Sequence, residues 1–152
     1  MRLALYQPDI PQNLGAFIRL AACLGTPLDI IEPCGFPVDD RRIRRAAMDY
    51  VDLARLCRHA SWEAFRRDHA PGPLVLLTTA GATRFTDARF RSDDILVLGR
   101  ESAGAPAEVH EAADLRVRVP MQKGARSLNV ALAAAMVLSE ALRQIDGYKA
   151  LA

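Results

Sequence analysis

Residues 94–104, Asp94-Ile95-Leu96-Val97-Leu98-Gly99-Arg100-Glu101-Ser102-Ala103-Gly104, join a continuous apolar run to a polar loop that is bounded by two glycines. A short uninterrupted apolar run is typical of a strand that is buried on both faces of a parallel sheet. Gly99 closes this strand and permits a tight turn, and the carboxylate of Glu101 follows two residues later. Ligands of open α/β sheets bind at such strand ends. This stretch therefore predicts an α/β fold and the place of its site.

Further strand signals lie on both sides of residues 94–104. We expect strands at residues 3–6, 28–31, 74–79 and 116–119. Helical spacing or capping signals between them predict helices after Asn13, around residues 41–45, at 61–69, at 106–113 and from 127 to about 145. Strands that alternate with helices predict a mostly parallel sheet covered by helices on both faces.

Local signals predict where several helices begin and end. Asn13, Ser61 and Ser127 are expected as N-caps, and Gly25 is expected just after the end of its helix. Cys23 falls in an apolar helix, so we expect a buried small side chain there.

The last helix is apolar on every face in its middle, residues 130–138. Such a helix must be buried. Two arrangements satisfy this requirement: packing against a partner subunit, or a position between the sheet and other helices.

Composition sets further bounds. The 152 residues suit a single domain, residues 1–152, with a net charge of +2 and an ordinary share of charged side chains, 25%. No apolar run is long enough for a membrane span, so we expect a cytoplasmic protein. The three cysteines show no Cys-x-x-Cys spacing and no grouping with histidines, so no metal site is expected.

Familiar nucleotide-binding and hydrolase motifs are missing from the sequence. There is no Gly-x-Gly-x-x-Gly after the first expected strand and no Gly-x-Ser-x-Gly elbow. Gly99 and Gly104 have the spacing of a P-loop, but Ala105-Pro106 stands where a P-loop needs lysine and serine or threonine.

Three polar segments remain, each where an expected strand leads into a loop or helix. They are Asn13-Leu14-Gly15 with Arg19, then Gly99-Arg100-Glu101 with Gly104, then Pro120-Met121 with Ser127-Leu128-Asn129-Val130. Together they resemble the three signature motifs of the SPOUT class, the knotted RNA 2′-O-methyltransferases that use S-adenosylmethionine. The resemblance covers essentially the whole chain. Arg100 departs from the small residue or proline that relatives often carry there.

The resemblance implies a deep C-terminal trefoil knot, a homodimer and S-adenosylmethionine as methyl donor, with no metal. It implies a catalytic set of Asn13, Arg19, Glu101, Ser127 and Asn129. The cofactor site that it implies is Leu77, Gly99, Val119, Met121, Ser127 and Leu128.

A narrower match points to the substrate. Residues 31–36, Ile-Glu-Pro-Cys-Gly-Phe, and 44–50, Arg-Arg-Ala-Ala-Met-Asp-Tyr, resemble the subfamily that methylates the wobble nucleotide (position 34) of tRNA. No appended RNA-binding domain is expected. The anticodon stem-loop would then meet the cations and the aromatic ring at Arg41, Arg42, Arg44, Arg45, Tyr50 and Arg126.

The resemblance leaves the reaction's base open. A guanidinium does not deprotonate in proteins, so we expect Arg19 to orient the ribose or its phosphate and to stabilise developing negative charge. Two alternatives to a tRNA enzyme remain at this stage: a ribosomal-RNA 2′-O-methyltransferase of the same class, and a catalytically silent RNA-binding module.

Overall fold

The computed structural model describes residues 1–38, 40–47 and 50–151, and it contains a seven-stranded sheet in the order β3-β2-β1-β6-β4-β7-β5. Every pairing between these strands is parallel, which confirms the predicted sheet. The strands are β1 (Arg2–Tyr6), β2 (Leu28–Ile31), β3 (Leu56–His59), β4 (Leu74–Leu77), β5 (Thr83–Arg84), β6 (Ile95–Leu98) and β7 (Leu115–Arg118).

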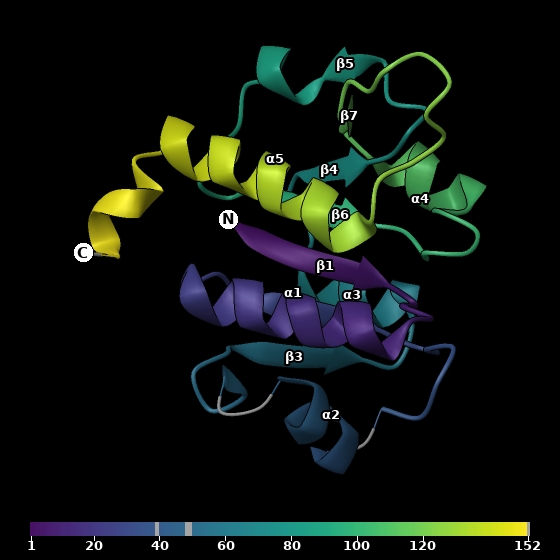
Figure 1. Ribbon diagram of the computed structural model, residues 1–152, viewed down its shortest axis with the longest axis vertical. Helices are drawn as coiled ribbons and strands as arrows, with labels where there is room; N and C mark the ends of the chain where they lie inside the picture. The colour runs from purple at the N-terminus through teal and green to yellow at the C-terminus, as the bar shows by residue number, and fades with distance from the viewer. Residues whose placement is uncertain (39, 48–49, 152) are drawn as a thin grey trace.

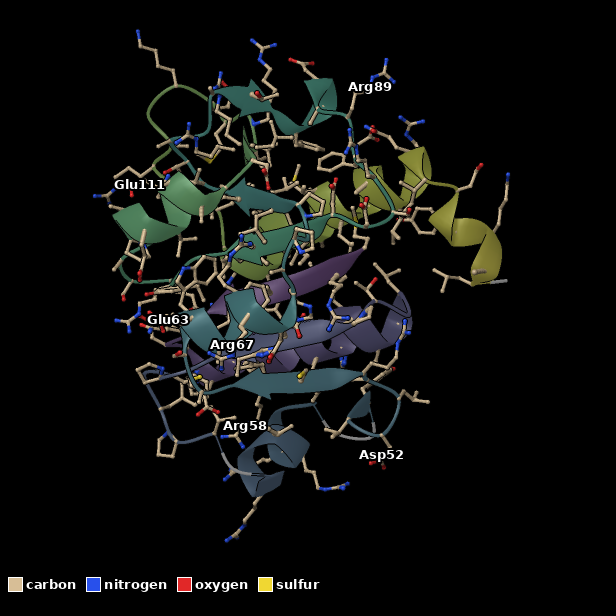
Figure 2. All side chains as sticks on the ribbon, turned by 180° about the vertical axis from the view of Figure 1, so that it is seen from behind. Asp52, Arg58, Glu63, Arg67, Arg89 and Glu111 are labelled. Atoms are coloured by element: carbon tan, nitrogen blue, oxygen red, sulfur yellow. The ribbon has the colours of Figure 1, made fainter. Side chains whose placement is uncertain are left out.

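Helices cover both faces of the sheet. They are α1 (Pro11–Cys23), α2 (Asp40–Ala47), α3 (Trp62–Asp68), α4 (Ala107–Ala112) and α5 (Val130–Gln144), with 3-10 turns at Phe85–Asp87 and Gly147–Ala150. In Figure 1, α1 and α5 lie in front of the sheet, and α2 lies beyond its β3 edge. Figure 2 shows the opposite face, where α3 and α4 present Glu63, Arg67 and Glu111 to solvent.

Two apolar layers result from the alternation of side chains along buried strands. Leu96 and Leu98 of β6 pack in the layer that includes Phe17 of α1 and Val137 of α5. Ile95 and Val97 of the same strand, which point the other way, belong to the layer with Phe65 of α3. The continuous apolar strands are therefore explained by burial on both sides, as the sequence predicts.

The connections change direction between β1 and β6. β1 leads into α1 on one face, and its neighbour β6 leads into α4 on the other. Loops that diverge from adjacent strand ends leave a crevice at the carboxyl edge of the sheet, where ligands bind in open α/β folds.

Strand β7 lies between β4 and β5, although β4 and β5 follow one another along the chain. Residues 78–82, which join these two strands, must therefore cross β7. The crossing is tight: a Cβ built on Gly81 would lie 2.5 Å from the carbonyl carbon of Val117. Arg118 of β7 donates to the Ala82 carbonyl at 2.7 Å and fastens the crossing segment.

Two N-cap predictions are wrong, and a third is confirmed. α1 begins with Pro11 at its first position and Ile10 as its cap, because proline has the helical φ and no N–H to satisfy. α5 is capped by Asn129 and not by Ser127. Ser61 caps α3 by accepting from the Ala64 N–H at 3.2 Å.

Of the other local predictions, that for Gly25 is confirmed and that for Cys23 is wrong. Gly25 follows α1 with φ +58°, the left-handed value expected after a helix end. Cys23 is exposed and not buried, because it lies on the side of α1 that faces away from the sheet. Strands β3 and β5 were not predicted: β3 contains two exposed residues, and β5 has only two residues.

Helix α5 is buried on one side only. Its sheet-facing residues, such as Ala134, Val137 and Leu138, are fully buried, whereas Leu132 is 62% exposed and Met136 43% exposed. Within one chain, the apolar helix is therefore not enclosed between the sheet and other helices. Among the described residues, no helix is long and apolar enough to cross a membrane.

Candidate active site

A cavity of about 420 Å³ opens at the carboxyl ends of β4, β6 and β7, beside the N-terminus of α5. Residues from all three predicted motifs line it. The expected cofactor residues all take part: Leu77, Gly99, Val119, Met121, Ser127 and Leu128. Four of the five expected catalytic residues take part as well: Asn13, Glu101, Ser127 and Asn129. Positions far apart in the sequence therefore meet at one strand-end cavity.

The loop after β6 is folded tightly back on itself. The backbones of Arg100 and Gly104 exchange N–H···O bonds of 3.0 and 2.9 Å. A Cβ on Gly99 would lie 2.4 Å from the carbonyl carbon of Gly104, and Gly104 itself has φ +70°. Both glycines are therefore required by the turn, which leaves backbone as the wall of the cavity.

Glu101 lies at the centre of a hydrogen-bond cluster. One carboxylate oxygen, Oε1, accepts from Asn13 Nδ2 at 3.2 Å, and the other, Oε2, accepts from the Asp9 N–H at 2.9 Å. Burial, and then the neighbouring Asp9 carboxyl group, raise the pKa of Glu101 above its usual value. Glu101 is therefore a carboxylate whose basicity is increased, inside a cavity, as general base catalysis requires.

The two asparagines connect this cluster to α5. Asn13 is buried, and its Oδ1 accepts from Asn129 Nδ2 at 3.0 Å. Asn129 Oδ1 in turn accepts from the N–H groups of Ala131 and Leu132 at 2.9 and 3.2 Å. Because Asn129 caps the helix with its oxygen, its amide nitrogen must point toward Asn13, which fixes both amides in one orientation.

Arg19 lies outside this cavity in the single chain. It is exposed on α1 and lines a second hollow between α1 and α5 together with Ala16, Leu20 and Leu132. The Arg19 guanidinium carbon is 4.9 Å from the centre of the Tyr50 ring. The structure therefore brings Arg19 together with one expected RNA-binding residue but not with Glu101.

The other expected RNA-binding residues lie on two separate segments. Arg41, Arg44 and Arg45 are exposed on α2, which is anchored by buried Ile43. Arg44 forms an exposed ion pair of 3.3 Å with Asp52. Arg126 is exposed on the loop before α5, and the side chain of Arg42 falls outside what the structure describes. Met48 and Asp49 of the narrower match also fall outside the described residues.

Asp9 was not predicted from the sequence, although it makes more hydrogen bonds to the Glu101 loop than any predicted residue. Asp9 follows β1 by three residues, in the same relation to its strand as Glu101 to β6. The expectation that ligands bind just beyond strand ends, which pointed to Glu101, would have pointed to Asp9 as well. Thr78 and Thr79, predicted as the end of a strand, instead line the cavity from the loop after β4.

Potential metal ligands also gather on the α3 side of the sheet. The ligand atoms of Asp29, Cys57 and His59 lie within 4.8 Å of one another. Fully buried Asp29 already accepts from Arg2 Nε at 2.8 Å and Arg2 Nη2 at 2.9 Å, and the rings of His59 and His69 lie 2.9 and 3.2 Å from its Oδ1. The Arg2 ion pair and the histidines account for this buried carboxylate.

Comparisons with known proteins agree with this geometry. A family model described as the SpoU rRNA Methylase family matches residues 1–139. A tRNA (cytidine(34)-2′-O)-methyltransferase of Beijerinckia indica is 59% identical over 145 residues, which cover 94% of this chain and 91% of that protein.

Solved structures are similar over the same length. One, from a study of 2′-OH methylation of C/U34 on tRNA, has a TM-score of 0.89 at 40% identity and covers 96% of both chains. The SpoU methyltransferase AviRb of Streptomyces viridochromogenes, in complex with AdoMet, has a TM-score of 0.80 at 29% identity and covers 95% of this chain and 60% of that one.

The parallel sheet, its carboxyl-edge cavity and these neighbours define the SPOUT class of methyltransferases. Within that class, the chain belongs to the SpoU rRNA Methylase family.

Proposed function

We propose that this protein transfers a methyl group from S-adenosylmethionine to the ribose 2′-hydroxyl of the wobble nucleotide, position 34, of tRNA. The observation that carries the proposal is that residues of three separate motifs, Asn13, Glu101 and Ser127 among them, line one cavity. The 59% identical relative is named for this reaction, which favours position 34 of tRNA over ribosomal RNA as the substrate.

The cavity fits the methyl donor in size and in chemistry. Leu77, Val119 and Leu128 provide apolar walls, and the Gly99 turn provides backbone groups at the strand end. The donor's sulfonium supplies an already activated methyl group, so no metal is required for the transfer. The Glu101 carboxylate lies on the same cavity wall, where it favours a positively charged ligand.

Positioning and proton removal are the tasks left to the protein. Asn13 and Asn129 hold the Glu101 loop against the start of α5. Arg19 orients the ribose or its phosphate as a hydrogen-bond donor and stabilises the negative charge that develops on the 2′-oxygen.

The same proposal includes a homodimer formed through α1 and α5. Exposed Leu132 and Met136 form an apolar face on α5, beside the hollow that contains Arg19. In a monomer Arg19 remains outside its own cavity, so we propose that it serves the cavity of the partner subunit. The proposal also includes a C-terminal knot and a cytoplasmic location, which the resemblance to this family favours.

The tRNA would bind along the cationic helix α2 and the loop that contains Arg126. Arg41, Arg44 and Arg45 would contact backbone phosphates, which gives affinity without sequence information. The affinity for an anticodon stem-loop should therefore fall steeply as the salt concentration rises. This salt dependence should be weaker in a variant in which Arg41, Arg44 and Arg45 are all replaced by alanine. Equal salt slopes for both proteins would remove α2 from the RNA site.

The reaction is tested by incubating the protein with labelled S-adenosylmethionine and total tRNA from a strain that lacks the gene. Mass spectrometry then maps the methylated nucleoside. We expect a 2′-O-methyl group at position 34, and no labelling of a stem-loop with 2′-deoxyribose at that position. Labelling of ribosomal RNA alone would keep the chemistry and overturn the substrate. Labelling of neither RNA would favour the silent binding module.

Mixed dimers test the role of Arg19. Arg19→Ala and Glu101→Gln are each expected to be inactive, but a heterodimer of the two contains one complete site if Arg19 acts across the interface. Recovery of activity on mixing, toward one quarter of the wild-type value for random exchange, supports the proposal. Absence of recovery, with exchange verified by native mass spectrometry, shows that Arg19 acts within its own subunit.

A further inference from the structure

We propose that Asp9 is a positioning residue that holds Glu101 as the acceptor of the ribose 2′-hydroxyl proton. The inference rests on the proposed methyl transfer and assigns its base. Asp9 belongs to none of the three sequence motifs, and it does not line the cavity. It acts on the reaction only through Glu101.

The two residues bind each other reciprocally. The Asp9 N–H donates to Glu101 Oε2 at 2.9 Å, and the Glu101 N–H donates to Asp9 Oδ1 at 3.2 Å. The second oxygen of Asp9 accepts from the Ser102 hydroxyl. These bonds fasten the loop after β1 to the loop after β6, so that a movement of Asp9 moves the Glu101 carboxylate.

A third loop prevents Asp9 from moving away. The Gly35 N–H donates to the Pro8 carbonyl at 3.0 Å, and a Cβ built on Gly35 would lie 2.6 Å from Asp9 Cβ and 2.9 Å from its Cα. Only glycine fits against Asp9 at this distance. The Asp9 side chain is thus pressed between the loops that follow β2 and β6.

The charged groups around Glu101 favour its protonated form. Among the described residues, no arginine or lysine forms an ion pair with Glu101, and the guanidinium of Arg100 donates instead to Gln7 Oε1. On the β2 side, burial raises the pKa of the Cys34 thiol to about 11, so the thiol is neutral. The α5 side presents the uncharged amide of Asn129 through Asn13.

Among the residues that the structure describes, Asp9 is the charged group with direct hydrogen bonds to Glu101. Hydrogen bonding to the Glu101 carboxyl group holds the pKa of Asp9 below its usual value, while burial and this same contact raise the pKa of Glu101. The pair therefore keeps its negative charge on Asp9 and gives the next proton to Glu101. A carboxylate with a raised pKa is the stronger base.

The step balances without another reactant. The 2′-oxygen forms a bond to the methyl carbon as the bond from that carbon to sulfur breaks, and the electron pair of the broken bond stays on sulfur. The hydroxyl proton passes to the Glu101 carboxylate, whose hydroxyl then donates to Asp9. Release of this proton to solvent after product departure restores the site.

The test compares single-turnover methyl transfer across pH for wild type, Asp9→Asn, Asp9→Glu and the control Asp87→Asn, which removes an exposed carboxylate elsewhere. Transfer requires ionised Glu101, so the rate falls at low pH. Asp9→Asn retains the shape of the side chain but removes the carboxylate whose hydrogen bond, after burial, raises the pKa of Glu101. We expect its acid limb to move down by roughly one pH unit and its plateau rate to fall by up to about tenfold, because the rate falls at most in proportion to the basicity that is lost.

In Asp9→Glu the acid limb of the pH profile should lie closer to its wild-type position than in Asp9→Asn. The profile of Asp87→Asn should match that of wild type. KM for the anticodon stem-loop should stay within a factor of about two in all four proteins, because Asp9 does not line the cavity. A wild-type acid limb and plateau in Asp9→Asn would overturn the proposal.

A second measurement covers the case in which Asp9→Asn does not fold. Carbon-13 NMR follows the titration of the Glu101 carboxyl group in the wild-type protein without substrate. We expect wild-type Glu101 to titrate above the usual glutamate range. The titration midpoint of Glu101 should fall only a little in Asp9→Glu and should fall further in a folded neutral variant, such as Asp9→Ser. Titration of wild-type Glu101 at or below the usual range would overturn the proposal. Because this readout needs no RNA, it is independent of whether the proposed methyl transfer itself occurs.

Discussion

Asp29 and Glu101 are carboxylates withdrawn from solvent on the same sheet, and their surroundings differ in one respect. Asp29, fully buried in β2, has a guanidinium on both of its oxygens. Glu101, beyond the end of β6, has an amide and a backbone N–H on its oxygens and a second carboxylate beside it.

The pKa shifts of the two groups have opposite directions. Burial raises the pKa of Asp29, but the hydrogen bonds from Arg2 and His59 outweigh it and leave the pKa below its usual value. Burial and the Asp9 carboxyl group raise the pKa of Glu101. A buried acid that is paired with a cation destabilises the fold when that cation is removed. An acid that is held only by neutral donors keeps a raised basicity that chemistry can use.

The largest effect is expected for Asn13→Ala. This change removes a donor from Glu101 and leaves the Asn129 amide without its acceptor. Asn13 therefore places the Glu101 carboxylate, and a misplacement of about 1 Å in an active-site group lowers rates by about 10²-fold. Single-turnover methyl transfer should fall by this factor, and Gln12→Ala, on the exposed side of the same helix turn, should have no effect. Equal rates in the two variants would separate Asn13 from the reaction.

Arg2→Met should instead affect folding. It leaves the Asp29 carboxylate buried without its cation, which costs about 3 kcal/mol in the free energy of unfolding. Arg116→Met, which removes an exposed arginine from β7, serves as the control and should cost less than about 0.5 kcal/mol. Denaturant unfolding measures both, and the methyl-transfer rate per folded molecule should be unchanged. A stable but inactive Arg2→Met would contradict the structural role of Asp29.

The same ion pair, between Arg2 and Asp29, should make the free energy of unfolding depend on pH. The pKa of Asp29 is lowered in the folded state, so its stabilisation is complete above the unfolded pKa of about 3.9 and is lost as pH falls through the folded value. The difference in unfolding free energy between wild type and Asp29→Asn should therefore shrink below pH of about 4. Urea unfolding between pH 7 and 3 measures this difference. A difference that is constant or grows toward low pH would be incompatible with a lowered pKa.

The smallest effect concerns the start of α5, where stability and catalysis meet. Asn129→Ala removes the cap of the helix and should cost about 1 kcal/mol in unfolding free energy, whereas Ser127→Ala should cost almost nothing, since Ser127 is not the cap. Thermal unfolding compares the two variants. A larger loss for Ser127→Ala would restore the cap that the sequence predicted.

The sequence predicted β1, β4 and β6, because burial on both faces leaves a continuous apolar run. It also predicted β2 and β7, whose apolar residues are interrupted by Asp29 and by two arginines. It could not predict β3, where only Leu56 and His59 face protein, or β5, whose two residues pair with a strand much later in the chain. The three motifs predicted which residues line the cavity. They did not predict Asp9, because its effect on Glu101 depends on the proximity of two loops separated by about ninety residues.

Two of the predicted helix caps were wrong for a related reason. Asn13 and Ser127 were each plausible caps when considered alone. In the structure Pro11 starts α1, which leaves Asn13 available to bind Glu101, and Asn129 caps α5 while it holds Asn13. Such double use of a side chain is visible only once both helices are placed.

The most direct test of the contrast measures Glu101→Gln and Asp29→Asn side by side, each for its methyl-transfer rate and for its unfolding free energy. Both changes replace a carboxylate with an amide of the same shape. We expect Glu101→Gln to lose at least about a hundredfold in rate with its stability nearly unchanged. We expect Asp29→Asn to lose stability and to retain its rate per folded molecule. Glu101→Gln with a wild-type rate, or Asp29→Asn that is stable and inactive, would contradict this contrast.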